Sequence, residues 1–141
     1  MHFVAALGRA LRLVLDCNVL VAAARGSETC RLAVVRAIAE HEIAVSAPIL
    51  AEYRDVCARP KHRAHQAVLS AMIDAVEAIS VAVEPARMAF SLADPDDEVY
   101  LATAVASRAE TLITGNLRHF SEARYGPVEI LSPRASLDRT D

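Results

Sequence analysis

The chain has 141 residues, of which 54% are hydrophobic and 4% aromatic, and its 15 Lys and Arg against 18 Asp and Glu give a formal net charge of −3. This composition excludes intrinsic disorder and predicts one compact domain, because a domain of roughly 150 residues buries about 70% of its unfolded surface. The negative charge excludes a general positive field, so contact with nucleic acid requires a local basic patch.

The start of the chain and the cysteines both predict a cytoplasmic protein. Arg9 and Arg12 cut short the apolar run at residues 3–7, so neither a signal sequence nor a membrane span is expected, and residues 1–10 are predicted to be a loose leader. The cysteines are odd in number and lack metal-ligand spacing, which is typical of buried free thiols in a reducing compartment. They are Cys17, Cys30 and Cys57.

From residue 11 to residue 131, short apolar runs alternate with helical patterns. Strands are predicted at residues 11–15, 43–46, 80–83, 111–114 and 128–131. Helices are predicted from Ser27 or Thr29 to about 40, and over about 48–59, 65–79 and 97–108. This order predicts a three-layer α/β domain, with a central parallel sheet of about four to five short strands flanked by helices. Residues 132–141 are expected to form a polar tail.

Helical spacing also predicts which side chains are buried. In the first helix the expected inward residues are Leu32, Val35 and Ile38. In the third helix they are Val68, Met72, Val76 and Ile79. Two tyrosines, Tyr53 and Tyr100, are expected in the core.

Four oxygen-bearing side chains lie where the elements meet one edge of the predicted sheet. Asp16 and Asn116 follow strands, Glu52 lies one turn into the helix after the second strand, and Asp97 lies in the first turn of a later helix. Ligands bind beyond the carboxyl ends of parallel strands, so these groups are expected to converge. Oxygen ligands suit Mg²⁺ or Mn²⁺, which indicates phosphodiester chemistry. The alternative is that each Asp is a structural cap.

The acidic cluster before the last predicted helix offers several candidates. Asp97 shares a helical face with Tyr100 and Leu101, the expected inward side. Asp94 and Asp96 fall in the preceding loop and are typical of a helix cap and a solvent charge, with Asp96 the second choice as a ligand.

Four blocks in this order resemble the PIN-domain family, in particular the small VapC-like ribonucleases that are toxins of type II toxin–antitoxin pairs. The blocks are VLDCNVL at 14–20, APILAEY at 47–53, DPDDE at 94–98 running into ATA at 102–104, and LITGN at 112–116. The resemblance covers about residues 11–131.

The resemblance implies a metal-dependent endoribonuclease with a catalytic quartet of Asp16, Glu52, Asp97 and Asn116. Asp16 and Asp97 would bind Mg²⁺ or Mn²⁺ directly, Glu52 would act through a water, and Asn116 would position a ligand or a water. An antitoxin protein and a homodimer are the implied partners. Thr114 is expected either to hydrogen-bond Asp16 or to cap its own backbone.

Two positions depart from the family pattern. Asn116 stands where many members carry Asp, which weakens the expectation of a second metal ion while leaving a one-metal site. His119 stands where relatives often have a further acid.

Basic residues offer candidate contacts to the RNA backbone. The densest stretch surrounds His62 and follows Glu52, and a weaker group lies beyond Asn116. The candidate residues are Arg54, Arg59, Lys61, Arg63 and Arg118. The alternative is an ordinary solvated surface.

Two other functions compete with RNA cleavage. A nuclease for structured DNA would share the acidic cluster, but the chain is too short to carry an inserted arch or clamp. A catalytically silent PIN-like module for dimerisation or protein binding is favoured by Asn116 and disfavoured by the three retained carboxylates.

Overall fold

The computed structural model describes residues 10–87, 92 and 95–139, and its centre is a β-sheet. The strands are β1 (Arg12–Leu15), β2 (Glu42–Val45), β3 (Val81–Ala82), β4 (Thr111–Ile113), β5 (Arg124–Tyr125) and β6 (Val128–Leu131). They form one six-stranded sheet in the order β3-β2-β1-β4-β6-β5. The first strand, β1, lies near the middle of this sheet. The chain crosses over before β4, so the carboxyl ends of the parallel neighbours β1 and β4 lie side by side.

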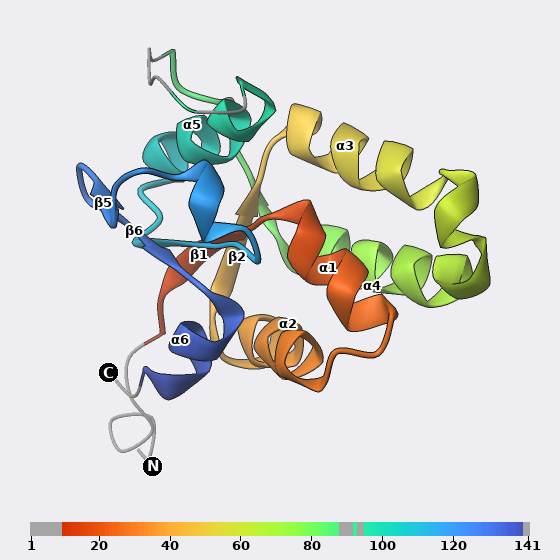
Figure 1. Ribbon diagram of the computed structural model, residues 1–141. Coiled ribbons are helices and arrows are strands. Elements are labelled where there is room, and N and C mark those ends of the chain that lie inside the picture. Colours follow the sequence, from red (N-terminus) through yellow and green to blue (C-terminus); the bar gives the residue numbers. More distant parts are fainter. Residues whose placement is uncertain (1–9, 88–91, 93–94, 140–141) are drawn as a thin grey trace.

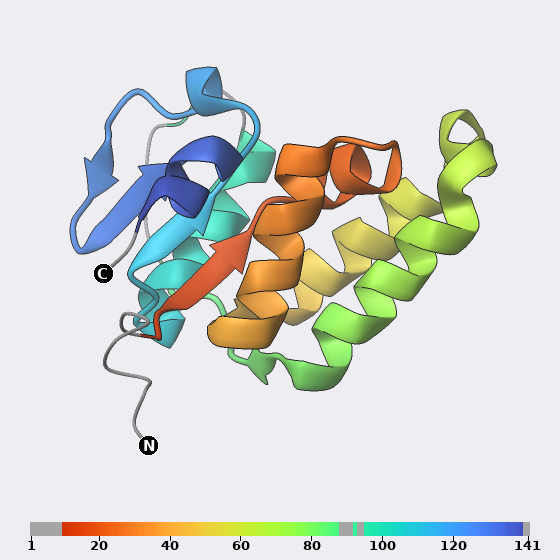
Figure 2. The ribbon, with the colours of Figure 1, turned by 90° about the horizontal axis from the view of Figure 1, so that it is seen from below.

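Helices cover both faces of the sheet (Figure 1). They are α1 (Cys17–Ala24), α2 (Glu28–Glu40), α3 (Ala47–Cys57), α4 (Gln66–Ile79), α5 (Glu98–Ser107) and α6 (Pro133–Asp138). Short 3₁₀ turns lie at η2 (Pro60–His65), η3 (Pro95–Asp97) and η4 (Leu117–His119). Figure 2, seen from below, shows α2 and α6 in front of the sheet with α5 behind it.

The predicted α/β fold class is confirmed, with one addition to the sheet. Strand β5 pairs antiparallel with β6, Arg124 opposite Glu129 and Tyr125 opposite Val128, whereas the other pairings are parallel. Gly126, at a φ of 60°, permits the tight turn between the two strands. A strand of two residues has no periodicity that a sequence could reveal, so β5 was not predicted.

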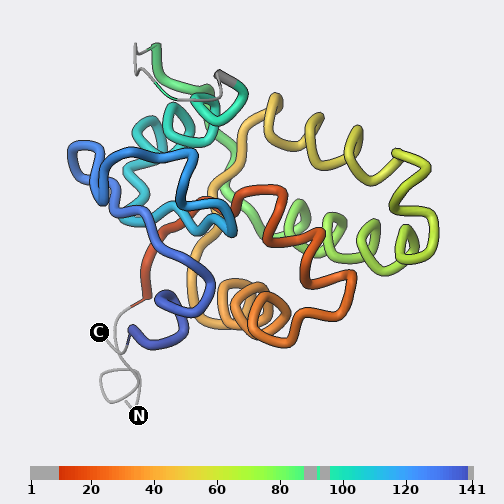
Figure 3. Tube along the Cα trace, viewed as in Figure 1, coloured from red at the N-terminus to blue at the C-terminus, as the bar shows by residue number. Residues whose placement is uncertain are grey.

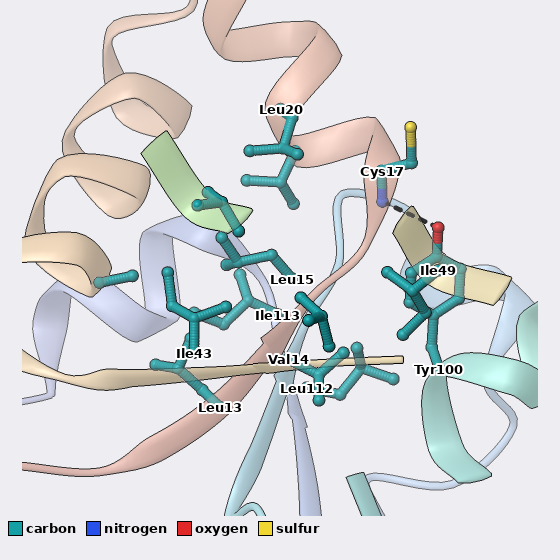
Figure 4. Packing of buried hydrophobic residues seen from close by; sticks show 14 of the residues in the cluster. Leu13, Val14, Leu15, Cys17, Leu20, Ile43, Ile49, Tyr100, Leu112 and Ile113 are labelled. Carbon is teal, nitrogen blue, oxygen red and sulfur yellow. Dashed lines mark hydrogen bonds between the residues drawn. The ribbon is translucent and has the colours of Figure 1, made fainter. Parts of the chain in front are cut away.

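The core lies on both sides of the central strands. Val14 and Leu112, from the neighbouring strands β1 and β4, are fully buried. Figure 4 shows them packed together with Leu13, Leu15 and Ile113. A strand buried on both faces needs apolar residues at successive positions, which explains the unbroken runs in the sequence.

The predicted inward faces of α2 and α4 were right in part, since Val76 is buried and Ile38 and Met72 pack partly buried against the core. In α2, Ala33, Val34 and Ala37 are buried while Leu32 and Val35 are 42% and 50% exposed. Small alanines allow α2 to lie close against α1, so the larger side chains point away from that contact.

In α4 the prediction holds at Val76, but the other fully buried positions are one residue later than predicted. Its buried residues are Leu69, Ile73 and Val76, whereas Val68 and Ile79 are about half exposed. A helix this rich in apolar residues supports two possible stripes, and packing against α1 and α3 selects one of them.

Within the expected polar tail at residues 132–141, Pro133–Asp138 form α6. This helix begins at a cap in which the Ser132 hydroxyl accepts the Ala135 backbone N–H at 3.0 Å. Arg36 of α2 donates to the Leu137 carbonyl at 2.8 Å, and Pro133 is buried. The expected leader lies outside the described residues except for Ala10. Among the helices in the described ranges, none has the length and hydropathy needed to span a membrane.

Candidate active site

Asp16 lies at the junction of β1 and α1. Its side chain is 5% exposed, its Oδ1 accepts the Asn18 backbone N–H at 3.5 Å, and its Oδ2 accepts the Thr114 hydroxyl at 2.9 Å. Burial raises the pKa of Asp16 from 3.8 to about 6, the Thr114 hydrogen bond opposes that rise, and the charges of Asp97 and Glu52 add to it. Three carboxylates therefore lie close enough to influence one another.

The loop after β4 is tied to Asp16 through Thr114. The bond to Asp16 confirms one of the two expectations for Thr114. The other is present as well, because the Thr114 hydroxyl also accepts the Asn116 backbone N–H at 3.0 Å and so caps its own loop. Asn18 adds a second tie, because its Oδ1 accepts the Gly115 N–H at 2.8 Å. A Cβ at position 115 would lie 3.2 Å from that oxygen, so a glycine suits the approach.

Asn18 is a site residue that the sequence analysis did not single out. It lies two residues after Asp16 within one of the family blocks. Its place in that block was the only feature of the sequence that could have identified it.

Glu52 is held by a tyrosine rather than by its own helix. The Tyr100 hydroxyl donates to the Glu52 carboxylate and accepts the Cys17 N–H at 3.3 Å (Figure 4). Burial raises the pKa of Tyr100 well above its ordinary value, which keeps the hydroxyl protonated as a donor. Both expected core tyrosines are buried, and Tyr53 also donates to the Leu15 carbonyl at 2.5 Å.

Asp97 faces inward and Asp96 is exposed, as the helical face predicted. Asp97 is 7% exposed at the N-cap position of α5, yet its side chain makes no cap hydrogen bond. Its Oδ2 instead lies 2.7 Å from His119 Nδ1. This geometry argues against the alternative of a structural cap at Asp97. Asp94 lies outside the described residues.

Asn116 completes the arrangement. Its Nδ2 lies 2.8 Å from His119 Nε2, so hydrogen bonds run from Asp16 through Thr114, Asn116 and His119 to Asp97. The predicted convergence of Asp16, Asp97 and Asn116 is therefore present, with Glu52 joined beside Asp16 through Tyr100.

The donor set fits a hard divalent cation by its chemistry. Carboxylate and amide oxygens are the ligands that Mg²⁺ and Mn²⁺ prefer. In the described ranges, no group of three His, Cys, Asp or Glu side chains forms a preformed metal cage. Mg²⁺ is usually held by one or two carboxylates and waters, so the fit is to such an open site and not to a closed one.

The predicted RNA-binding residues do not share one environment. Arg54 donates to Asp74 at 2.7 Å and to Glu77 at 2.8 Å, so it braces α3 against α4. Lys61 and Arg63 are exposed on η2, at the end of the α3–α4 hairpin away from the sheet (Figure 3). Arg59 precedes them and pairs loosely with Asp55, and Arg118 is exposed on η4. The basic side chains with exposed positions are thus Arg59, Lys61, Arg63 and Arg118.

A groove between α2 and α4 shares no residue with this site. It has a volume of about 500 Å³ and is apolar apart from Arg31. Val35 and Val68, two of the exposed residues noted above, line it.

A family model described as "PIN domain" matches residues 12–118, which include all four members of the expected quartet. The chain belongs to the PIN-domain family. This PIN domain is also similar to a chain in the crystal structure of VapBC2 from Rickettsia felis bound to a DNA fragment from their promoter. The TM-score is 0.57 at 16% identity, over 86% of this chain and 98% of that one. That likeness supports the fold. A search of curated proteins found no match.

Proposed function

We propose that this PIN domain is a metal-dependent endoribonuclease and the toxin of a toxin–antitoxin pair. The observation that carries the proposal is the hydrogen-bonded arrangement joining Asp16 to Asp97, with Glu52 beside it. Burial raises the pKa of Asp16 most, and the charges of the nearby Asp97 and Glu52 raise it further. Repulsion between these carboxylates destabilises the fold unless a bound cation offsets it.

Each residue has a role in hydrolysis. Asp16 and Asp97 would hold Mg²⁺ or Mn²⁺, and Glu52 would orient the attacking water. When bound, the ion supplies a nucleophile from water and offsets the charge that develops on the phosphate. Asn116 contributes an amide where many relatives have Asp, so the site has three carboxylates and suits one ion better than two.

The RNA backbone would be held by exposed basic residues on two separate segments. Arg59, Lys61 and Arg63 lie at the end of the α3–α4 hairpin, and Arg118 follows Asn116. Phosphate contacts of this kind position a substrate without reading its sequence. Arg54 is left out of this proposal because two carboxylates already engage it.

We propose two protein partners. One is an antitoxin that restrains the nuclease in the cytoplasm, and the other is a second copy of the chain. The antitoxin is what the VapC-like resemblance of this chain implies, and the similar structure, VapBC2, is bound to a DNA fragment from their promoter. The exposed apolar groove is the kind of surface that a protein partner covers.

Cleavage of defined RNAs with and without EDTA tests the proposal. Purified protein should cut RNA in Mg²⁺ or Mn²⁺ and stop in EDTA, and Asp97→Asn should be inactive, whereas Asp138→Asn at an exposed position should be as active as wild type. Cleavage that EDTA does not affect would contradict the metal dependence. No cleavage over many RNAs in both metals would favour the silent binding module that Asn116 suggests, and cutting of structured DNA alone would favour the DNA nuclease.

A further inference from the structure

His119 is a polar residue of the site that the proposed function does not use. It lies at the end of η4, where its backbone N–H donates to the Asn116 carbonyl at 3.0 Å. Its ring lies between two members of the quartet, with Nδ1 at 2.7 Å from Asp97 and Nε2 at 2.8 Å from Asn116. The ring therefore joins the loop after β4 to the start of α5.

The chemistry of its neighbours assigns the ring protons. An ionised carboxylate only accepts hydrogen bonds, so Nδ1–H donates to Asp97 Oδ2. With the amide nitrogen of Asn116 facing it, Nε2 accepts. Both ring nitrogens are satisfied in the Nδ1–H tautomer.

Asp97 takes its hydrogen bond to His119 from outside its own helix. An aspartate at an N-cap ordinarily bonds the free N–H groups of its own helix from an extended backbone. Here Asp97 has helical φ and ψ of −77° and −16° and makes no such bond. His119, from the η4 turn, donates to the carboxylate and so joins Asp97 to the segment after β4.

We propose that His119 is a positioning residue that fixes the Asp97 carboxylate for cation binding. This proposal rests on the proposed metal-dependent function. A carboxylate at this position would add a fourth negative charge beside Asp97, whereas the imidazole gives orientation without that charge. Hydrogen-bond partners of ligating groups typically contribute 10–100-fold to metal affinity or activity.

Three substitutions separate the two ring nitrogens. In His119→Asn, an amide nitrogen can take the place of Nδ1, so the donor to Asp97 is kept. In His119→Gln, the amide reaches the place of Nε2 and the donor to Asp97 is lost. His119→Ala removes both contacts, and His65→Ala, on the distant η2 turn, is the control.

Mn²⁺ affinity, measured by calorimetry without RNA, is the first readout. The Ala and Gln variants should bind Mn²⁺ about 10–100-fold more weakly than wild type. The Asn variant should remain closer to wild type, and the control should be unchanged. Equal affinity in all variants, or an Asn variant as weak as the Ala variant, would overturn the proposal. Thermal melting in EDTA checks that each variant folds. If the Ala variant does not fold, the comparison of the Asn and Gln variants decides the test.

Imidazole ¹⁵N NMR of the metal-free protein is the second readout. The Nδ1–H tautomer is expected, and an Nε2–H tautomer would overturn the proposal even if the affinities agreed. The two readouts also separate this proposal from the function on which it rests. Wild-type protein that binds no Mn²⁺ would refute the metal site itself. The positioning role of His119 would then be refuted as well, whichever tautomer is observed. Metal-bound protein that cleaves no RNA would refute only the nuclease.

Discussion

Asp16 is a buried carboxylate whose ionised form destabilises the folded state. Its pKa is about 6 in the folded protein and 3.8 without these surroundings, so the unfolded chain releases the proton more readily. The stabilising contribution of the protonated form is complete below about pH 4 and is lost as the pH rises through 6. At pH 7.5 the ionisation of Asp16 lowers the free energy of unfolding by roughly 3 kcal/mol, at 1.36 kcal/mol per pKa unit.

Asp16→Asn should therefore be more stable than wild type at pH 7.5, and the difference should shrink toward pH 4. The single amide oxygen can still accept the Thr114 hydroxyl, and only the 3.5 Å contact from the Asn18 N–H to the other carboxylate oxygen is lost. Urea unfolding at several pH values measures the effect, with Asp138→Asn at an exposed position as the matched control. A difference between Asp16→Asn and wild type that does not change with pH would contradict the burial argument.

Asp97→Asn separates catalysis from stability. The absence of a cap hydrogen bond predicts that this variant, in EDTA, is as stable as wild type or more so, because one repelling charge is removed. Wild type should gain about 2.7 kcal/mol at a metal concentration of a hundred times the dissociation constant, and the variant should lose most of this gain. Thermal melts with and without EDTA, at one protein concentration, measure both effects. A variant that melts well below wild type in EDTA would show that Asp97 is structural.

At the scale of elements, Tyr100 joins α5 to the starts of α1 and α3. Removing its hydroxyl in Tyr100→Phe leaves the Cys17 N–H without its acceptor and frees Glu52. An unsatisfied buried donor costs about 1–3 kcal/mol, so unfolding in urea should show a loss of that size. RNA cleavage should fall as well, since Glu52 loses its orientation. Tyr125→Phe, near the edge strand β5, should leave cleavage unchanged, which controls for the loss of a tyrosine hydroxyl.

The α3–α4 hairpin carries basic residues of two kinds, and substitution distinguishes them. Replacing Arg59, Lys61 and Arg63 with Ala should weaken RNA binding and lower its log–log salt slope by about 0.7 per lost contact to a single strand. Arg54→Ala removes the same charge per residue but should leave the slope unchanged, because Arg54 is engaged by Asp74 and Glu77. Binding titrations over a range of salt concentrations measure the slopes. Equal slopes in wild type and the triple variant would show that the hairpin end is only solvated surface.

The sequence predicted the site better than it predicted helix packing. The convergence of Asp16, Asp97 and Asn116 follows from a general property of parallel sheets, which needs only the positions of strand ends and helix starts. The inward face of α2 depends on how closely Ala33 and Ala37 approach α1, and α1 itself was not predicted because it begins directly after β1. His119 could be noted as a departure, but its contact with Asp97 joins residues from two segments that no local pattern relates.

At the scale of the whole molecule, the groove between α2 and α4 predicts assembly. Apolar side chains such as Val35 and Val68 line it, and a monomer would leave them in water. We expect a homodimer, and light scattering at tens of micromolar should give about twice the monomer mass of 15.2 kDa. Val68→Glu should shift the equilibrium toward monomer if this groove is the interface. Wild-type protein that is monomeric at these concentrations would contradict the expectation.

The order of the strands also determines when the site can exist. Leu13 of β1 pairs with Thr111 of β4, so residues 98 positions apart in the chain lie side by side in the two central strands. Ribosomes add about 5–20 residues per second, which puts about 5–20 s between the synthesis of the first central strand and the second. During that interval Asp16 and Glu52 have been made, but Asp97 and Asn116 have no finished sheet on which to meet them. A growing chain therefore carries no assembled site, and the proposed nuclease activity would not reach the ribosome that makes this protein until most of the domain has been synthesised.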